Sequence, residues 1–139
     1  MKKIVLIVSF AFIFLGCKHD NNDGNCFQVA CTEEFVTIVV TITDQNNNPV
    51  ALDSFEVIVI ETGMDITRQL SDTEFQSAQQ NGMYPLFGDE WQNTFENQEI
   101  DVRFKGFLNG QEVANRDYSV GADCCHVDLI SGDTTIMTD

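Results

Sequence analysis

The sequence has little positive charge, few prolines and little tryptophan. Seven Lys or Arg stand against 22 Asp or Glu, and the 139 residues include two prolines, two histidines and one tryptophan. The shortage of basic residues argues against nucleic acid as a partner, because binding to a phosphate backbone depends on Lys and Arg. The apolar run at residues 4–15 is shorter than the roughly 20 residues that a membrane-spanning helix needs.

The beginning of the chain has the pattern of an export signal. Lys2 and Lys3 precede the apolar run, which is the order of a charged and then an apolar region in a signal peptide. The run ends at residues 14–17, Phe-Leu-Gly-Cys, which resembles the lipobox of bacterial lipoproteins. This resemblance implies cleavage after residue 16 and attachment of lipid to Cys17. An ordinary secretory signal is the alternative, but no small-x-small cleavage site precedes Cys17.

These features divide the chain into three expected parts: a signal peptide at 1–16, a lipidated flexible tether at 17–25 and a folded domain at 26–139. Residues 18–25 include no apolar side chain. Burial of apolar surface is what offsets the entropy lost on folding, so we expect the tether to be disordered.

Removal of the signal peptide leaves five basic against 22 acidic residues, a net charge of −17. An anionic membrane surface repels such a domain, so attachment depends on the acyl chains, and stable anchoring takes more than one chain. We expect the protein at the bacterial outer membrane, on its surface or periplasmic face. Its expected partners are the membrane, through the lipid, and a glycan or an envelope protein.

Four cysteines remain once Cys17 is assigned to lipid: Cys26, Cys31, Cys124 and Cys125. An even number in an exported protein predicts two disulfides. Pairing Cys26 with Cys31 would force the two adjacent cysteines into a strained ring, so we expect two bridges between the ends of the domain. Zinc at Cys124, Cys125 and His126 is the alternative, but adjacent cysteines on a strand point to opposite faces.

Most of the domain shows the period of two that is typical of β-strands. The sequence predicts strands with apolar or β-branched alternation over residues 36–43, 55–60, 100–105, 111–120, 127–129 and 135–137. Both faces of 55–60 look buried. Asn109-Gly110 is a hairpin signal, and only 73–80 has helical composition, enough for a one- or two-turn helix or a loop. The predicted fold is all-β, a single antiparallel β-sandwich of about seven strands.

Residues 36–44, VTIVVTITD, followed by Asn-Pro-Val at 48–50, resemble the opening hairpin of carboxypeptidase-regulatory-like modules and related prealbumin or immunoglobulin-like domains. The resemblance implies a β-sandwich appended to a surface protein, without catalytic residues of its own. It therefore favours a non-enzymatic binding or structural accessory module at the cell envelope.

The stretch at 82–91 groups three aromatic residues, Tyr84, Phe87 and Trp91, among turn-forming and acidic residues. Aromatic rings flanked by carboxylates and amides are typical of sugar-binding loops. They predict a ligand platform in a loop and, as an alternative function, a carbohydrate-binding lipoprotein. The competing interpretation is that these rings fill the core.

Other chemistry has little support in the sequence. The turn at 44–48 has the first ligands of a calcium loop, but Pro49 stands where glycine is needed and Phe55 where a glutamate is needed. Asp89 and Glu90 are neighbours in sequence, which rarely places two carboxyls on facing walls of a glycosidase cleft. No Gly-x-Ser-x-Gly motif is present. We therefore expect no metal, no cofactor and no enzymatic activity.

Overall fold

The computed structural model describes Cys26 and residues 29–138. The expected signal peptide at 1–16, the tether at 17–25 and Cys17 lie outside these residues. In the described part, the helices and strands follow one another as β1 (Thr37–Thr43), β2 (Ser54–Val59), α1 (Asp72–Asn81), β3 (Met83–Gly88), the 3₁₀-helix η1 (Asp89–Trp91), β4 (Gln98–Leu108), β5 (Gln111–Ala122), β6 (Val127–Ser131) and β7 (Thr135–Met137).

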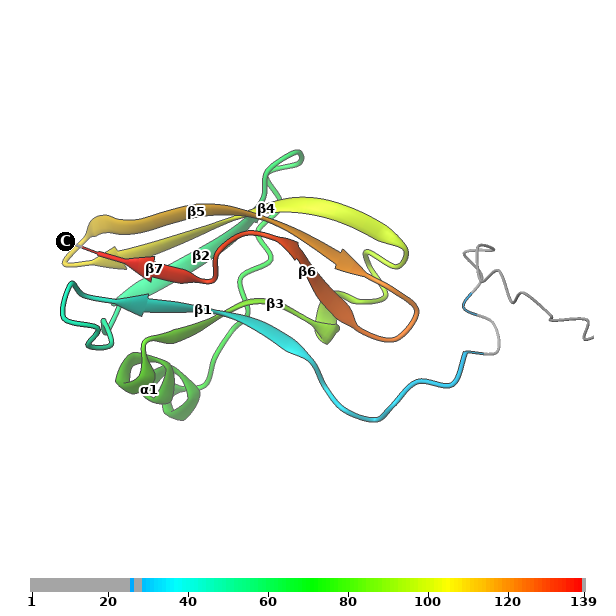
Figure 1. Cartoon of the computed structure of the whole chain (residues 1–139), viewed down its shortest axis with the longest axis horizontal. Coiled ribbons are helices and arrows are strands. Elements are labelled where there is room, and N and C mark those ends of the chain that lie inside the picture. Colours follow the sequence, from blue (N-terminus) through cyan, green and yellow to red (C-terminus); the bar gives the residue numbers. More distant parts are fainter. Residues whose placement is uncertain (1–25, 27–28, 139) are drawn as a thin grey trace, which may run out of the picture.

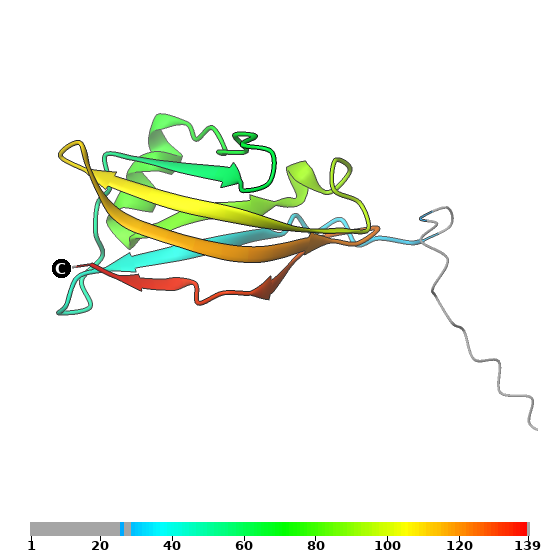
Figure 2. The same cartoon turned by 90° about the horizontal axis from the view of Figure 1, so that it is seen from above.

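The strands form two sheets, which confirms the predicted all-β sandwich. One sheet has the order β3-β1-β7 and the other the order β2-β4-β5-β6 (Figure 1). The long β4–β5 hairpin runs the length of the molecule (Figure 2). One pair departs from the expected antiparallel arrangement, because β7 lies parallel to β1, with Thr41 opposite Thr135. The chain changes sheet between β6 and β7, and this crossing brings β7 alongside β1 in the same direction.

Two predicted turns form through local hydrogen bonds and backbone geometry. Asn109 and Gly110 have φ angles of 52° and 73°, which are the positive values that a type I′ hairpin turn requires at both central positions. At the other turn, the Asp44 carboxylate accepts hydrogen bonds from the main-chain N–H groups of Asn46 and Asn48, and Asn47 has a φ of 62°. Both turns lie at the end of the molecule opposite Cys26 (Figure 1).

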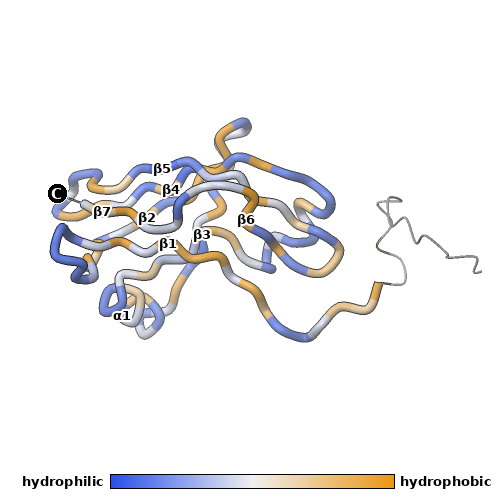
Figure 3. Tube along the Cα trace, in the orientation of Figure 1, coloured by the Kyte–Doolittle hydropathy of each residue, from blue (hydrophilic) through white to orange (hydrophobic). Residues whose placement is uncertain are grey.

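The core fills the space between the sheets with inward-facing side chains from alternate strand positions. The Phe55 ring is central, with its centroid 5.9 Å from that of Phe104 and 5.6 Å from that of Tyr84. The hydropathy colouring shows apolar positions recurring along the strands and polar residues at the turns (Figure 3). β2 buries only one face, because Glu56 is exposed and Ile60, just beyond its end, is 41% exposed. The prediction of two buried faces for this strand is therefore wrong.

The predicted short helix is a ten-residue α-helix, α1. The side chain of Ser71 accepts a hydrogen bond from the N–H of Glu74, and the Glu74 carboxylate accepts one from the N–H of Ser71. This reciprocal capping box satisfies two main-chain donors at the N-terminus of the helix. Gly82 ends the helix with a φ of 65°, and its N–H donates to the carbonyl of Ala78. The helix is longer than expected because both of its ends are capped.

Residues 82–91 form a strand and a short helix where the sequence predicted a loop. β3 pairs with β1, and the register shifts so that Leu86, between Pro85 and Phe87, has no counterpart on β1. Leu86 and Phe87 are consequently both buried, and the bulge removes the alternation by which strands are identified. Pro85 is tolerated because β3 is at the edge of its sheet.

Candidate functional site

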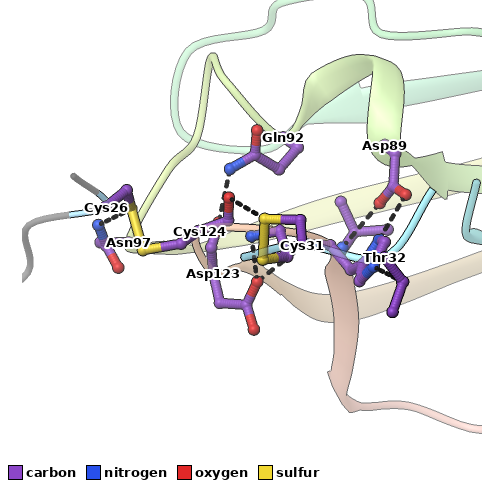
Figure 4. The surroundings of a disulfide bond; sticks show 11 residues. Cys26, Cys31, Thr32, Asp89, Gln92, Asn97, Asp123 and Cys124 are labelled. Atoms are coloured by element: carbon purple, nitrogen blue, oxygen red, sulfur yellow. Dashed lines mark hydrogen bonds and ion pairs between the residues drawn. A yellow bond between two sulfur atoms is a disulfide. The ribbon is translucent and has the colours of Figure 1, made fainter. Parts of the chain in front are cut away.

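Two disulfides close the end of the sandwich where the described chain begins (Figure 4). They join Cys26 to Cys124 and Cys31 to Cys125, each with a Cα–Cα distance of 5.2 Å. Both bridges connect the N-terminal segment to the link between β5 and β6. The sequence left open whether Cys26 pairs with Cys124 or with Cys125, and the structure has the pairing with Cys124.

The β5–β6 link is ordered by Asp123 and Gln92. One carboxylate oxygen of Asp123 accepts hydrogen bonds from the N–H groups of Cys125, at 2.6 Å, and His126, at 2.8 Å. These bonds hold the pKa of Asp123 below its ordinary value of 3.8. The buried Gln92 side chain donates to the Asp123 carbonyl at 2.7 Å (Figure 4). These hydrogen bonds therefore hold the backbone of the turn that carries the two adjacent cysteines.

His126 lies between Asp89 and Thr32. Its Nδ1 is 2.8 Å from Asp89 Oδ2, and its Nε2 is 2.8 Å from Thr32 Oγ1. Asp89, the first residue of η1, also accepts hydrogen bonds from the N–H groups of Val36, at 2.8 Å, and Val127, at 3.0 Å. The side chains of His126 and Asp89 are 24% and 10% exposed. We call Thr32, Asp89 and His126 the Asp–His clamp, because they join the N-terminal segment, η1 and the start of β6.

The clamp shifts the pKa values of both ionisable members toward their charged forms. Partial burial by itself raises the pKa of Asp89, but the hydrogen bonds from Val36, His126 and Val127 outweigh burial and leave the pKa below 3.8. The hydrogen bond to Asp89 raises the pKa of His126 above 6.5, against the smaller opposing effect of desolvation. The two shifts agree in favouring an imidazolium–carboxylate pair.

The order hydroxyl, imidazole and carboxylate is also that of a hydrolase triad. The surroundings favour a structural clamp instead. Thr32 belongs to the exposed N-terminal segment, and both carboxylate oxygens of Asp89 accept main-chain N–H groups. The hollows beside α1 and beside Ile100 are lined by other residues. The clamp fastens three segments together through these hydrogen bonds.

The predicted aromatic platform is wrong for two of its three residues. Tyr84 is fully buried and Phe87 is 2% exposed, so neither ring can stack on a sugar. The Tyr84 hydroxyl instead accepts a hydrogen bond from the N–H of Leu52, at 2.7 Å, and donates one to the carbonyl of Val50, at 2.9 Å. Trp91 is partly buried, and its ring packs near that of Phe95, with centroids 6.3 Å apart. The competing interpretation, that these rings fill the core, is correct for Tyr84 and Phe87.

The side chains considered for metal binding have other partners. Both oxygens of Asp44 accept hydrogen bonds within its own turn, from Asn46 and Asn48. Cys124 and Cys125 are oxidised in the two disulfides. Among the residues that the structure describes, no group of three or more His, Cys, Asp or Glu is placed to hold a metal ion.

The clamp was not foreseen from the sequence. Thr32 and Asp89 are separated from His126 by 94 and 37 residues, and no motif joins them. The one sequence signal is the position of His126 directly after two cysteines. Once Cys125 is paired with Cys31, His126 must lie close to Thr32.

Over Cys26 and residues 29–138, no helix combines the length and apolar character that crossing a membrane requires. Compared with models of known protein families, with curated proteins and with solved structures, the chain matches none of them.

Proposed function

We propose that this chain is a lipid-anchored, exported and non-enzymatic β-sandwich of the immunoglobulin-like or prealbumin-like type. It serves as a binding or structural accessory module at the bacterial cell envelope, held to the outer membrane by lipid on Cys17. The observation that carries the proposal is the pair of disulfides at the end of the domain where the described chain begins.

The disulfides support export because bridges of this kind persist in oxidising compartments and are rare in the cytosol. They also suit an anchored domain. Cys26 directly follows the expected tether at 17–25, and its bridge leads to Cys124 in the β5–β6 link. A pull on the anchor therefore passes into two strands of the larger sheet rather than peeling β1 from its partners.

The Asp–His clamp supports the same role. It attaches the segment after Cys31 to η1 and to β6, so the membrane-side end of the sandwich is held by side-chain hydrogen bonds as well as covalently. The two turns at the opposite end, at 44–49 and 109–110, then face away from the membrane and are the surfaces that a partner meets first.

Metabolic labelling with palmitate in a Gram-negative host tests the anchor. The unmodified chain should incorporate label and sediment with outer membranes, whereas Cys17→Ala should do neither and should keep its signal peptide. Cys31→Ser, paired with Cys125→Ser, is the matched control, because it removes a cysteine pair and should keep the label. Label that persists in Cys17→Ala would refute lipidation at this residue.

A hydrolase assay tests the non-enzymatic part of the proposal. Hydrolysis of p-nitrophenyl acetate by the unmodified chain and by His126→Gln should be equal, because the clamp holds structure rather than a reacting group. A rate that falls at least tenfold in the variant, while its circular dichroism spectrum is unchanged, would assign catalysis to the clamp.

A further inference from the structure

A groove lies between α1 and the neighbouring strands β3 and β1. Its volume is about 370 Å³, at the small end of the range of roughly 300 to 1,000 Å³ that is usual for ligand pockets. Residues of α1 form one wall, and residues of β3 and the start of β1 form the other. Figure 1 shows α1 beside β3. The groove contains none of the residues of the disulfide end, so its role is independent of the proposed anchor.

One wall of the groove is apolar and open to solvent. Met83 and Pro85 are two positions apart on β3 and so lie on the same face of the strand. Met83 is 44% exposed, and Leu70 and Ala78 continue the apolar lining toward α1. Methionine adapts readily to the shape of an apolar ligand. This wall therefore suits a compact apolar group.

A single arginine, Arg68, lines the groove. Arg68 Nη1 donates to Thr37 Oγ1 at 3.2 Å, and the guanidinium carbon lies 5.4 Å from the centroid of the Phe35 ring. Within the described residues, no ion pair joins Arg68 to a carboxylate, whereas Arg103 and Arg116 each have an aspartate partner. A guanidinium carries five N–H donors, so Arg68, which its neighbours position, keeps donors for a ligand beyond the one hydrogen bond described for it.

The carboxylate that lines the groove is held by the helix cap. Glu74 Oε2 accepts hydrogen bonds from the N–H and the hydroxyl of Ser71, at 2.8 and 2.7 Å. The hydrogen bond from the Ser71 side chain is the main reason why the pKa of Glu74 is lowered, and the charge of Arg68 adds only a smaller contribution. The groove thus offers an available cation within a chain whose net charge is −15.

We infer that this groove binds a small organic monocarboxylate with a compact apolar body. Arg68 donates parallel hydrogen bonds to the carboxylate, in the two-pronged geometry that guanidinium favours. The apolar body lies against Met83 and Pro85. A phosphate dianion is a poorer fit, because the surrounding acids repel a second negative charge. An organic cation is a poorer fit at Arg68, because like charges repel.

Isothermal titration and ligand-observed NMR with the full chain, both disulfides intact, test the inference with benzoate as the probe. Benzamide has the same shape without the charge, and acetate has the charge without the apolar body. Benzoate should bind saturably, and both comparison compounds should bind at least tenfold more weakly. Arg68→Gln should weaken benzoate binding at least tenfold, and Arg103→Gln, which alters an ion-paired arginine on the other sheet, should change it less than twofold.

Three results would overturn the inference. The first is that benzoate shows no saturable binding up to about 10 mM. The second is that benzoate and benzamide bind equally, and the third is that the two arginine variants weaken benzoate binding equally. If Arg68→Gln does not fold, the comparison of benzoate with benzamide on the unmodified chain decides alone.

Discussion

Removing one of the two disulfides should cost much less stability than removing both. The bridges cross in sequence and close nearly the same loop, because the partners in Cys26–Cys124 and Cys31–Cys125 are separated by 98 and 94 positions. Either bridge alone closes a long loop in the unfolded chain. The chain-entropy model assigns a loop of this length a stabilisation of about 4.7 kcal/mol at 25 °C.

The second bridge closes only a small additional ring. Five positions separate Cys26 from Cys31, and Cys124 and Cys125 are adjacent, so the ring spans about six residues and contributes about 2 kcal/mol. Replacing either pair by serine should therefore cost about 2 kcal/mol, and replacing both pairs about 7 kcal/mol. The losses of stability are strongly non-additive, because either bridge alone removes most of the loop-closure entropy of the unfolded chain.

Urea denaturation of the chain and its paired variants, followed by circular dichroism, measures these free energies of unfolding. The variants are Cys26→Ser with Cys124→Ser, Cys31→Ser with Cys125→Ser, and all four together. The expected loss on removing all four approaches the whole stability of a small domain, so the quadruple variant should be largely unfolded in buffer. A loss of about 4 to 5 kcal/mol from one pair alone would refute the reasoning from shared loop closure.

Three further predictions concern single side chains. The pKa of His126 is raised in the folded state, so its protonation stabilises the fold fully below pH 6.5 and less as the pH rises through the folded-state pKa. The pKa of Asp89 is lowered in the folded state, so its ionisation stabilises the fold above pH 3.8 and less as the pH falls through the folded-state pKa. His126→Gln should therefore lose more stability in urea at about pH 6 than at about pH 9, and equal losses would contradict the clamp. Tyr84→Phe leaves a buried main-chain donor and acceptor without partners and should cost about 1 to 3 kcal/mol by the same assay; a cost below about 0.5 kcal/mol would mean that these bonds are replaced. Gly110→Ala, at a φ of 73° with open space around the new methyl, should cost about 1 kcal/mol. Gly82→Ala should lower the thermal midpoint more, because its methyl would lie 2.5 Å from a carbonyl oxygen of β1, and equal midpoints for the two variants would show that the contact relaxes.

Much of the fold follows from short-range patterns. The alternating β-branched run at 36–43 forms β1, and Asn109-Gly110 forms the predicted hairpin turn. β3 was missed because its bulge at Leu86 and its proline both break the strand pattern. The parallel placement of β7 beside β1 was missed because three residues carry no information about the direction of a distant partner.

The candidate sites depended more on tertiary structure. An even count of cysteines predicts two bridges, but Cys124 and Cys125 are equivalent by spacing, and only the backbone of the turn that Asp123 orders distinguishes them. Tyr84 resembles a ligand-binding aromatic until its hydroxyl is seen to satisfy the buried main chain near Leu52. Which cysteines pair and whether Tyr84 is buried both depend on the surroundings of the side chain in the folded protein, which the sequence does not contain.

By itself, the sequence determined the elements whose energetics are local. These are the amphipathic strands, the Asn-Gly turn, the helical composition at 73–80 and the need for two bridges among four cysteines. Tertiary structure alone decided which cysteines pair, which aromatic rings are buried and that His126 meets Asp89 and Thr32. The physical reason is that hydrogen bonds and side-chain periodicity act between near neighbours in the chain. Pairing across some 90 residues depends on how both sheets close around a common core.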